Sequence, residues 1–119
     1  MDAQFRFENL LVYQQAVALS NRVFTITSKW PPQLRFSLGD QLNRAALSIS
    51  LNIAEGSSRT GKDFQHFLSI ARGSCYECIP IITIARDQKL IAQKAYEEMK
   101  QIIFELSKML TALRSSLTK

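Results

Sequence analysis

The chain has 119 residues, of which 46% are hydrophobic and 21% charged, a composition typical of one folded domain that excludes a wholly disordered chain. Fifteen Lys and Arg residues against ten Asp and Glu residues give a net charge of +5, spread along the chain without the basic tail of a dedicated nucleic-acid-binding arm. No apolar run approaches about 18 residues, which is the length of a membrane span, and no signal peptide is visible. Two cysteines also make no disulfide framework. We therefore expect a cytoplasmic protein without a membrane partner.

The first predicted helix covers residues 9–29. Apolar residues recur in it at alternating spacings of four and three, which is the period of one helix face. They are Val12, Ala16, Leu19, Val23 and Ile26, with Leu10, Val17 and Phe24 as a second row. The helix should end before Pro31, because a residue that precedes proline is displaced from the helical conformation.

The second predicted helix covers residues 38–57, with Ser37 as its N-cap and Gly56 as a left-handed terminus. On a helical wheel it has two separate apolar arcs. The first holds Leu38, Leu42, Ala45, Ala46, Ile49 and Ile53, and the second holds Leu47, Leu51 and Ala54. Two arcs give two packing surfaces, so one can face the core while the other meets a second copy of the chain. The sequence therefore predicts a homo-oligomer; the alternative is a central helix whose two arcs both pack within one chain.

A polar stripe separates the two arcs, and in it Asn52 takes a position where the apolar repeat would place an aliphatic side chain. Polar residues at such positions can fix helix register and oligomeric state. We predict a structural polar network or oligomer interface that combines this stripe with residues of the third helix. Its members are Gln41, Ser48, Asn52, Glu55, Gly56, Ser74 and Glu77. The alternative interpretation is a ligand-binding or catalytic cluster.

The third predicted helix covers residues 62–88 and the fourth covers residues 93–116. Thr60 and Asp63 are typical of a helix N-terminus. Pro80 lacks an amide hydrogen, which predicts a kink near residues 76–79, but no break, because the apolar repeat continues through it. Short connections make successive helices antiparallel. We therefore expect one all-α domain over residues 1–119, an up-down-up-down antiparallel four-helix bundle.

Motifs that would carry enzyme chemistry are weak. Cys75 and Cys78 form a Cys-x-x-Cys pair on the apolar face of the third helix, where we interpret them as core residues, and the chain has one histidine where a zinc site needs about four ligands. His66 with Asp63 would suit a hydrolase, but no nucleophile elbow accompanies them. No phosphate-binding glycine loop occurs. We therefore predict no metal, no cofactor and no enzymatic activity.

The basic residues are the remaining candidates for binding. Seven of them are predicted to contact nucleic acid: Arg44, Arg59, Lys62, Arg72, Lys94, Lys100 and Lys108. Acidic residues are interleaved with the lysines of the fourth helix, which is also typical of an ordinary solvated face. The aromatic residues fall mostly on apolar stripes, so no platform for stacked bases is expected.

The polar stripe belongs to a longer pattern. Residues 41–56 read QLNRAALSISLNIAEG, and Phe64, Phe67, Leu68, Ile70, Ala71, Gly73, Ser74 and Glu77 follow them. This pattern, together with Phe7, Leu10, Val12, Tyr13 and Ala16, resembles that of the 23S rRNA-intervening-sequence proteins, also called S23 ribosomal proteins, over nearly the whole chain. The chain departs from that family at Pro80 and in the turn over residues 87–91, which lacks the glycine common there.

The resemblance implies a small bacterial four-helix-bundle protein that forms a homopentamer and has no enzymatic activity. It also implies a likeness to the accessory protein of diversity-generating retroelements, a basic pentamer that works with a reverse transcriptase and RNA. We therefore predict a non-enzymatic oligomer that binds RNA, or an RNA–protein assembly, through a distributed basic surface. The alternative is a structural or adaptor protein that docks a protein partner, such as a reverse transcriptase, without contacting nucleic acid.

Overall fold

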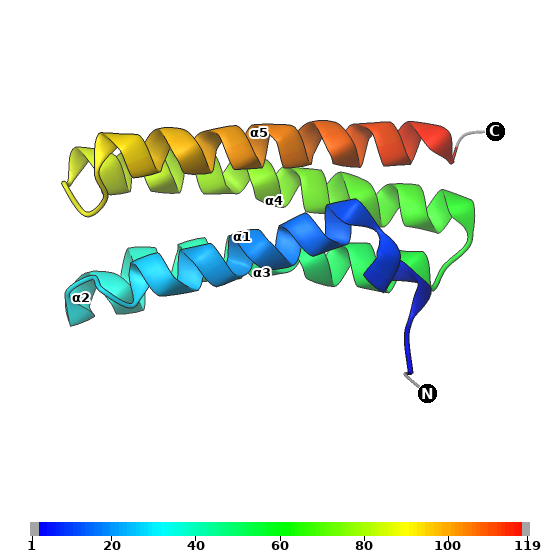
Figure 1. The fold of residues 1–119 in the computed structure, drawn as a ribbon, viewed down its shortest axis with the longest axis horizontal. Helices are drawn as coiled ribbons and strands as arrows, with labels where there is room; N and C mark the ends of the chain where they lie inside the picture. The colour runs from blue at the N-terminus through cyan, green and yellow to red at the C-terminus, as the bar shows by residue number, and fades with distance from the viewer. Residues whose placement is uncertain (1–2, 118–119) are drawn as a thin grey trace.

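The computed structural model describes residues 3–117, and they form helices joined by short connections. The four long helices are α1 (Leu11–Thr27), α3 (Asp40–Ser57), α4 (Gly61–Asp87) and α5 (Gln93–Ser116), and the short ones are η1 (Arg6–Asn9), α2 (Pro32–Leu34) and η2 (Arg35–Gly39). Successive long helices run in opposite directions, with α1 and α3 in one layer and α4 and α5 in the other (Figure 1). No strand occurs among residues 3–117, so the predicted all-α four-helix bundle is confirmed.

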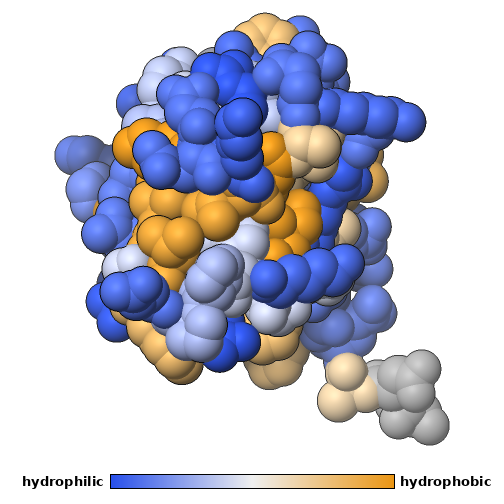
Figure 2. All heavy atoms as spheres, turned by 90° about the vertical axis from the view of Figure 1, so that its left-hand side faces the viewer, coloured by the Kyte–Doolittle hydropathy of each residue, from blue (hydrophilic) through white to orange (hydrophobic). Residues whose placement is uncertain are grey.

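Each long helix turns one apolar stripe into a shared core. Leu19 of α1, Ile49 of α3, Ile82 of α4 and Leu106 of α5 are all at most 1% exposed. Burial of one such side chain stabilises the fold by about 1.5–3 kcal/mol. Figure 2 views the end of the bundle that carries the α4–α5 turn, where hydrophobic side chains gather at the centre and hydrophilic ones surround them. The buried residues extend from Leu68 to Ala85 in α4 and from Tyr96 to Leu110 in α5, so the core runs along most of these helices.

The predicted helix bounds differ from the observed ones by at most two residues, but the caps differ more. The connection after Trp30 is itself helical, because Pro32 starts α2, which continues through the π-helical η2 into α3. Ser37 lies inside η2, and its hydroxyl donates to the Gln33 carbonyl oxygen at 2.8 Å. The prediction that Ser37 caps the helix is therefore wrong. Thr60 does occupy the N-cap position of α4, but its side chain makes no capping hydrogen bond.

The left-handed backbone conformation that was expected at the C-terminal end of α3 occurs instead at the C-terminal end of α4. Gly56 was expected to adopt a left-handed conformation, but no glycine among residues 3–117 has a positive φ, and α3 continues to Ser57. A side chain at Gly56 would instead meet Phe67, with a Cβ–Cβ distance of 2.6 Å. The left-handed residue is Lys89, with φ of 62°. It lets the Leu90 amide reach back to the Ala85 carbonyl oxygen at 2.8 Å, which ends α4.

The helix α4 passes through Pro80 without a break, as expected, and the predicted kink stays a prediction. Its length and composition are sufficient for a membrane-spanning helix, since an 18-residue window of it has a mean hydropathy of 1.2. The exclusion of a membrane span from the lack of an apolar run was therefore too strong. About 33% of that window is buried in the bundle. The buried residues of α4 are Leu68, Ala71, Ser74, Cys75, Cys78, Ile82 and Ala85.

Candidate nucleic-acid interface

Three polar side chains of the predicted network join α3 to α4. The Asn52 Nδ2 donates to the Ser48 carbonyl oxygen at 2.8 Å and to Ser48 Oγ at 2.9 Å. From α4, the Ser74 hydroxyl donates to the same Ser48 Oγ at 2.9 Å, and Ser74 is 3% exposed. A buried polar group that lost its partner would be destabilising by about 1–3 kcal/mol. These bonds therefore help to fix how α4 lies against α3.

The other members of the predicted network lie outside this chain of bonds. Glu55 is exposed, and its Oε2 lies 2.7 Å from an Arg59 guanidinium nitrogen. Gln41 and Glu77 are exposed and line a shallow pocket between α3 and α4. Gly56 is buried where Phe67 crosses it. The seven residues therefore lie along the α3–α4 seam, but they do not form one connected network.

The seven predicted nucleic-acid-binding cations are all exposed: Arg44 on α3, Arg59 in the α3–α4 turn, Lys62 and Arg72 on α4, and Lys94, Lys100 and Lys108 on α5. Among residues 3–117, Arg59 is the only one of the seven within 4.0 Å of a carboxylate oxygen. The hydrogen bond from Arg59 to Glu55, followed by the Glu55 charge, raises the Arg59 pKa. The other six are free of ion pairs within the described chain and can meet an external anion.

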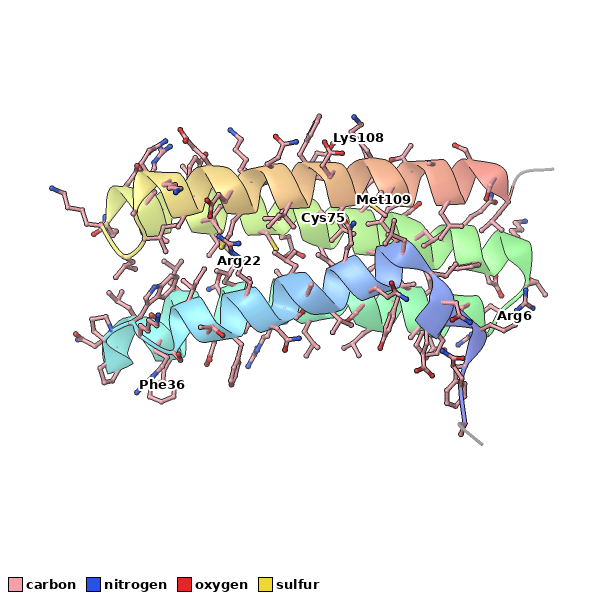
Figure 3. All side chains as sticks on the ribbon, viewed as in Figure 1. Arg6, Arg22, Phe36, Cys75, Lys108 and Met109 are labelled. Carbon is pink, nitrogen blue, oxygen red and sulfur yellow. The ribbon has the colours of Figure 1, made fainter. Side chains whose placement is uncertain are left out.

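A groove between α4 and α5 places aromatic rings beside three of these cations. Tyr76 and Phe104 are 57% and 54% exposed, and both line the groove. The Arg72 guanidinium carbon lies 4.8 Å from the centre of the Tyr76 ring, and the Lys108 Nζ lies 5.2 Å from the centre of the Phe104 ring. Lys100 also lines the groove. Figure 3 shows Lys108 projecting from the outer side of α5, away from α1 and α3.

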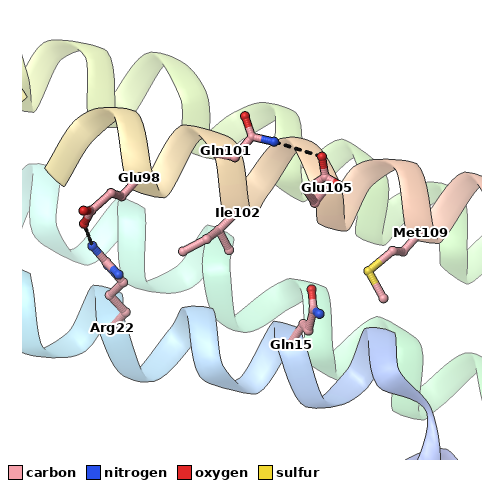
Figure 4. Close-up of a pocket in the computed structure, with 7 residues that line it drawn as sticks. All are labelled: Gln15, Arg22, Glu98, Gln101, Ile102, Glu105 and Met109. Atoms are coloured by element: carbon pink, nitrogen blue, oxygen red, sulfur yellow. Dashed lines mark hydrogen bonds and ion pairs between the residues drawn. The ribbon is translucent and has the colours of Figure 1, made fainter. Parts of the chain in front are cut away.

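A second, more open hollow of about 600 Å³ separates α1 from α5 (Figure 4). Arg22 of α1 spans it to Glu98 of α5, with 2.6 Å between guanidinium nitrogen and carboxylate oxygen. Along α5, the Gln101 side-chain amide donates to Glu105 at 2.9 Å. Both carboxylates in this hollow therefore already have a partner, and the hollow has the character of a solvated seam between two helices.

The two cysteines are packed in the core. Both are 0% exposed, and burial is the main cause that raises each thiol pKa to about 12. They remain protonated at neutral pH and are poor nucleophiles and metal ligands there. Among residues 3–117, no group of three or more His, Cys, Asp and Glu side chains is placed to hold a metal ion. His66 is exposed, and its ring centre lies 5.9 Å from that of Phe67.

The second apolar arc of α3 lies at the surface. Leu47 and Leu51 are 49% and 57% exposed, and Ala54 follows them on the same side. Phe24 of α1, 70% exposed, lines a pocket together with Leu47. The two arcs therefore do not both pack within one chain, and the alternative of a fully enclosed central helix is wrong for the single chain.

The sequence pattern over residues 41–56 thus lies on one helix, which contributes Ser48 and Asn52 to the α3–α4 contact and Leu47 and Leu51 to the surface. A sequence profile of the 23S rRNA-intervening sequence proteins matches residues 8–112, which is most of the bundle. The chain belongs to the 23S rRNA-intervening sequence protein family. The match ends within α5 and includes all of α1, α3 and α4.

The fold of this 23S rRNA-intervening sequence protein is found in a solved relative. The crystal structure of a protein of unknown function from the S23 ribosomal protein family of Bacteroides thetaiotaomicron superposes with a TM-score of 0.82. The two chains are 20% identical, and the match covers 88% of this chain and 96% of the other. A search of curated proteins found no match. The likeness to the accessory protein of diversity-generating retroelements stays a prediction.

Sequence reasoning about this family member missed the groove between α4 and α5. No role was predicted for Tyr76 or Phe104, and both lie outside the spacings of four and three that mark the core faces of α4 and α5. That offset was the available signal. A large ring displaced from the core repeat on each of two neighbouring antiparallel helices indicates a shared surface groove.

Proposed function

We propose that this 23S rRNA-intervening sequence protein is a non-enzymatic homo-oligomer that binds RNA, or an RNA–protein assembly, through its distributed basic surface. The observation that carries the proposal is the exposure of seven cations, six of them without an ion pair among residues 3–117. Such cations neutralise phosphates and release counterions, which dominates the affinity of proteins for nucleic acid. Separate cations on several helices suit recognition of RNA shape.

Oligomerisation would strengthen this binding. The exposed Leu47 and Leu51 form a surface that a second copy of the chain would cover, because contiguous exposed apolar side chains mark protein interfaces. The family resemblance implies a pentamer. Five copies with a net charge of +5 each would carry about +25, and one RNA that touches several copies gains from effective concentration.

The direct test is an RNA titration of purified, nucleic-acid-free protein across a range of salt concentrations, with duplex DNA as the comparison ligand. We expect submicromolar RNA binding that weakens steeply with salt, with a log–log slope of about −0.7 to −0.9 for each phosphate neutralised. Reversal of Arg44, Lys62 and Lys94 to glutamate should lower the affinity and flatten the slope. An absence of RNA binding at low salt would refute the proposal.

The oligomer is tested separately by light scattering. Leu51→Lys places a charge on the exposed apolar face and should reduce the particle mass, whereas Ser58→Lys, exposed beyond the end of α3, should leave it unchanged. A wild-type mass equal to the monomer mass of 13.5 kDa would contradict the homo-oligomer.

The alternative function, a structural or adaptor protein that docks a protein partner, is favoured by one observation. Phe24 of α1 and Phe36 of η2 are each 70% exposed, and exposed rings of this size are common anchors of protein partners. Retention of a defined protein partner, such as a reverse transcriptase, at high salt without RNA would support this alternative. Loss of that partner in Phe24→Ala would locate the contact.

A further inference from the structure

We propose that the groove between α4 and α5 binds unpaired bases of single-stranded nucleic acid, which stack on Tyr76 and Phe104 while Arg72, Lys100 and Lys108 hold the flanking phosphates. The inference rests on the proposed RNA-binding function and deepens it, because it assigns a site and a strand type. Base stacking in this groove would add to the attraction between the basic surface and the phosphates, and it can be measured separately.

The shape of the groove fits a flat apolar ligand. It has a volume of about 350 Å³, near the lower end of the range of about 300–1,000 Å³ for small-molecule sites. The buried Cys75 and Ile103 line its base, and the exposed Tyr76 and Phe104 line its sides. A nucleobase offers a π-face of the kind that such rings stack on, whichever base it is.

The register of the two helices brings the rings together. The Gln65 side-chain amide of α4 donates to the Arg114 carbonyl oxygen of α5 at 3.2 Å, and Thr83 and Tyr96 hydroxyls lie 3.4 Å apart at the other end. In this antiparallel register Tyr76 of α4 lies at the same height along the bundle as Phe104 of α5, across the groove. The two exposed rings therefore act on one ligand, and are not isolated surface side chains.

The charge around the groove favours an anionic partner. Its lining includes Lys100 and no carboxylate. Arg72 lies over the Tyr76 ring and Lys108 over the Phe104 ring, each within about 6 Å, which is the range of a cation–π contact. A strand that stacks its bases on the rings would bring its phosphates to these cations. This charge complementarity selects a nucleic acid over a neutral or basic apolar segment.

The exposure of the two rings leaves them accessible to a ligand. Both rings are more than half exposed, and the Arg72 guanidinium also donates to the Tyr76 hydroxyl at 2.9 Å. That bond holds the ring and the cation in one arrangement before a ligand arrives, which lowers the entropy lost on binding.

The experiment measures fluorescence anisotropy of labelled oligouridine and of duplex RNA with the intact protein. Stacking contributes about 1–3 kcal/mol per base, so Tyr76→Ala and Phe104→Ala should each weaken oligouridine binding roughly tenfold while duplex RNA binding and the salt slope stay unchanged. Phe5→Ala removes an exposed ring outside the groove, next to η1, and should change neither affinity. Tyr76→Phe keeps the ring but loses the hydrogen bond from Arg72, so it should weaken oligouridine binding less than Tyr76→Ala does. Oligothymidine offers the same kind of base π-face on a DNA backbone, so comparing its affinity with that of oligouridine shows whether the groove distinguishes DNA from RNA.

Each failure has a distinct meaning. If oligouridine affinity is unchanged in Tyr76→Ala and Phe104→Ala while duplex RNA still binds, the groove proposal is overturned and the basic-surface function stands. If the wild type binds no RNA at all, both proposals fail. If Tyr76→Ala changes the particle mass in light scattering, the groove is an interface between copies of the chain, and the base-binding proposal is overturned.

Discussion

Gly56 of α3 and Gly73 of α4 provide a matched test of the packing between the two helices. Replacing a glycine by alanine in a helix interior stabilises the helix by about 1 kcal/mol when the methyl group meets nothing. A methyl at Gly73 would have no atom within 4 Å. A methyl at Gly56 would lie 2.6 Å from the Phe67 Cβ and 2.8 Å from Phe64 Cδ1.

The sign of the Gly56→Ala effect follows from which of its neighbours can move. The Phe67 Cβ is attached directly to the α4 backbone, so relief of the overlap requires the helix itself to shift. Overpacking of this kind destabilises by about 1–3 kcal/mol, which exceeds the propensity gain. We expect Gly56→Ala to lower the free energy of unfolding by about 1 kcal/mol and Gly73→Ala to raise it by about 1 kcal/mol.

Circular dichroism during urea and thermal unfolding measures both effects, at one fixed protein concentration because an oligomer's Tm depends on concentration. A change of 1 kcal/mol corresponds to about 4 °C in Tm for a domain of this size. A stabilisation in Gly56→Ala equal to that in Gly73→Ala would show that α4 moves away freely, and the reasoning from this contact would be refuted.

Three further predictions concern the α4–α5 turn, the buried thiols and the α3–α4 network. Lys89→Gly should raise the unfolding free energy by about 0.5–1 kcal/mol, because φ at Lys89 is 62° and glycine adopts this region without strain. If urea unfolding shows no increase in the unfolding free energy of this variant, the turn at Lys89 is not strained. The free energy of unfolding should fall as pH rises from about 9 towards 12, because the unfolded Cys75 thiol loses its proton near 9 while the folded one keeps it until about 12. The fall per cysteine is about 1.4 kcal/mol per pH unit. If the free energy of unfolding of Cys75→Ala falls with pH as steeply as that of the wild type, this explanation is wrong. Asn52→Leu should preserve helicity yet alter the particle mass or its homogeneity, and an unchanged mass by light scattering would exclude Asn52 from fixing the assembly.

The helices could be predicted from the sequence because their core faces repeat with one period over their whole length. Leu68, Cys75 and Ile82 recur at intervals of seven and are all buried. Local backbone choices were harder to predict, since the repeat does not encode them. Gly56 was assigned a left-handed conformation from its residue type, whereas its actual constraint is the distant Phe67. Lys89 takes that conformation although a lysine gives no such signal.

The candidate site was only partly predictable for a related reason. A basic residue on a helix surface is exposed almost wherever it falls, so Lys94 and Lys100 could be placed from sequence. Whether a ring such as Tyr76 turns into the core or beside a neighbouring helix depends on the rotation of both helices. That rotation is fixed by contacts between distant residues, such as the bond from Ser74 to Ser48.

The seam between α1 and α5 has a consequence for how the protein opens. Its polar bridge is the exposed ion pair of Arg22 with Glu98, and exposed pairs of this type contribute at most about 1 kcal/mol. The α3–α4 seam has a smaller hollow, of about 300 Å³, and the hydrogen bond from Ser74 to Ser48 crosses this seam from helix to helix. Partial unfolding of the native state should therefore begin with detachment of α1, leaving a three-helix unit with its apolar face uncovered. Such a unit would be the species most prone to aggregate, so any partner that clamps α1 against α5 would act as a kinetic stabiliser of the whole protein.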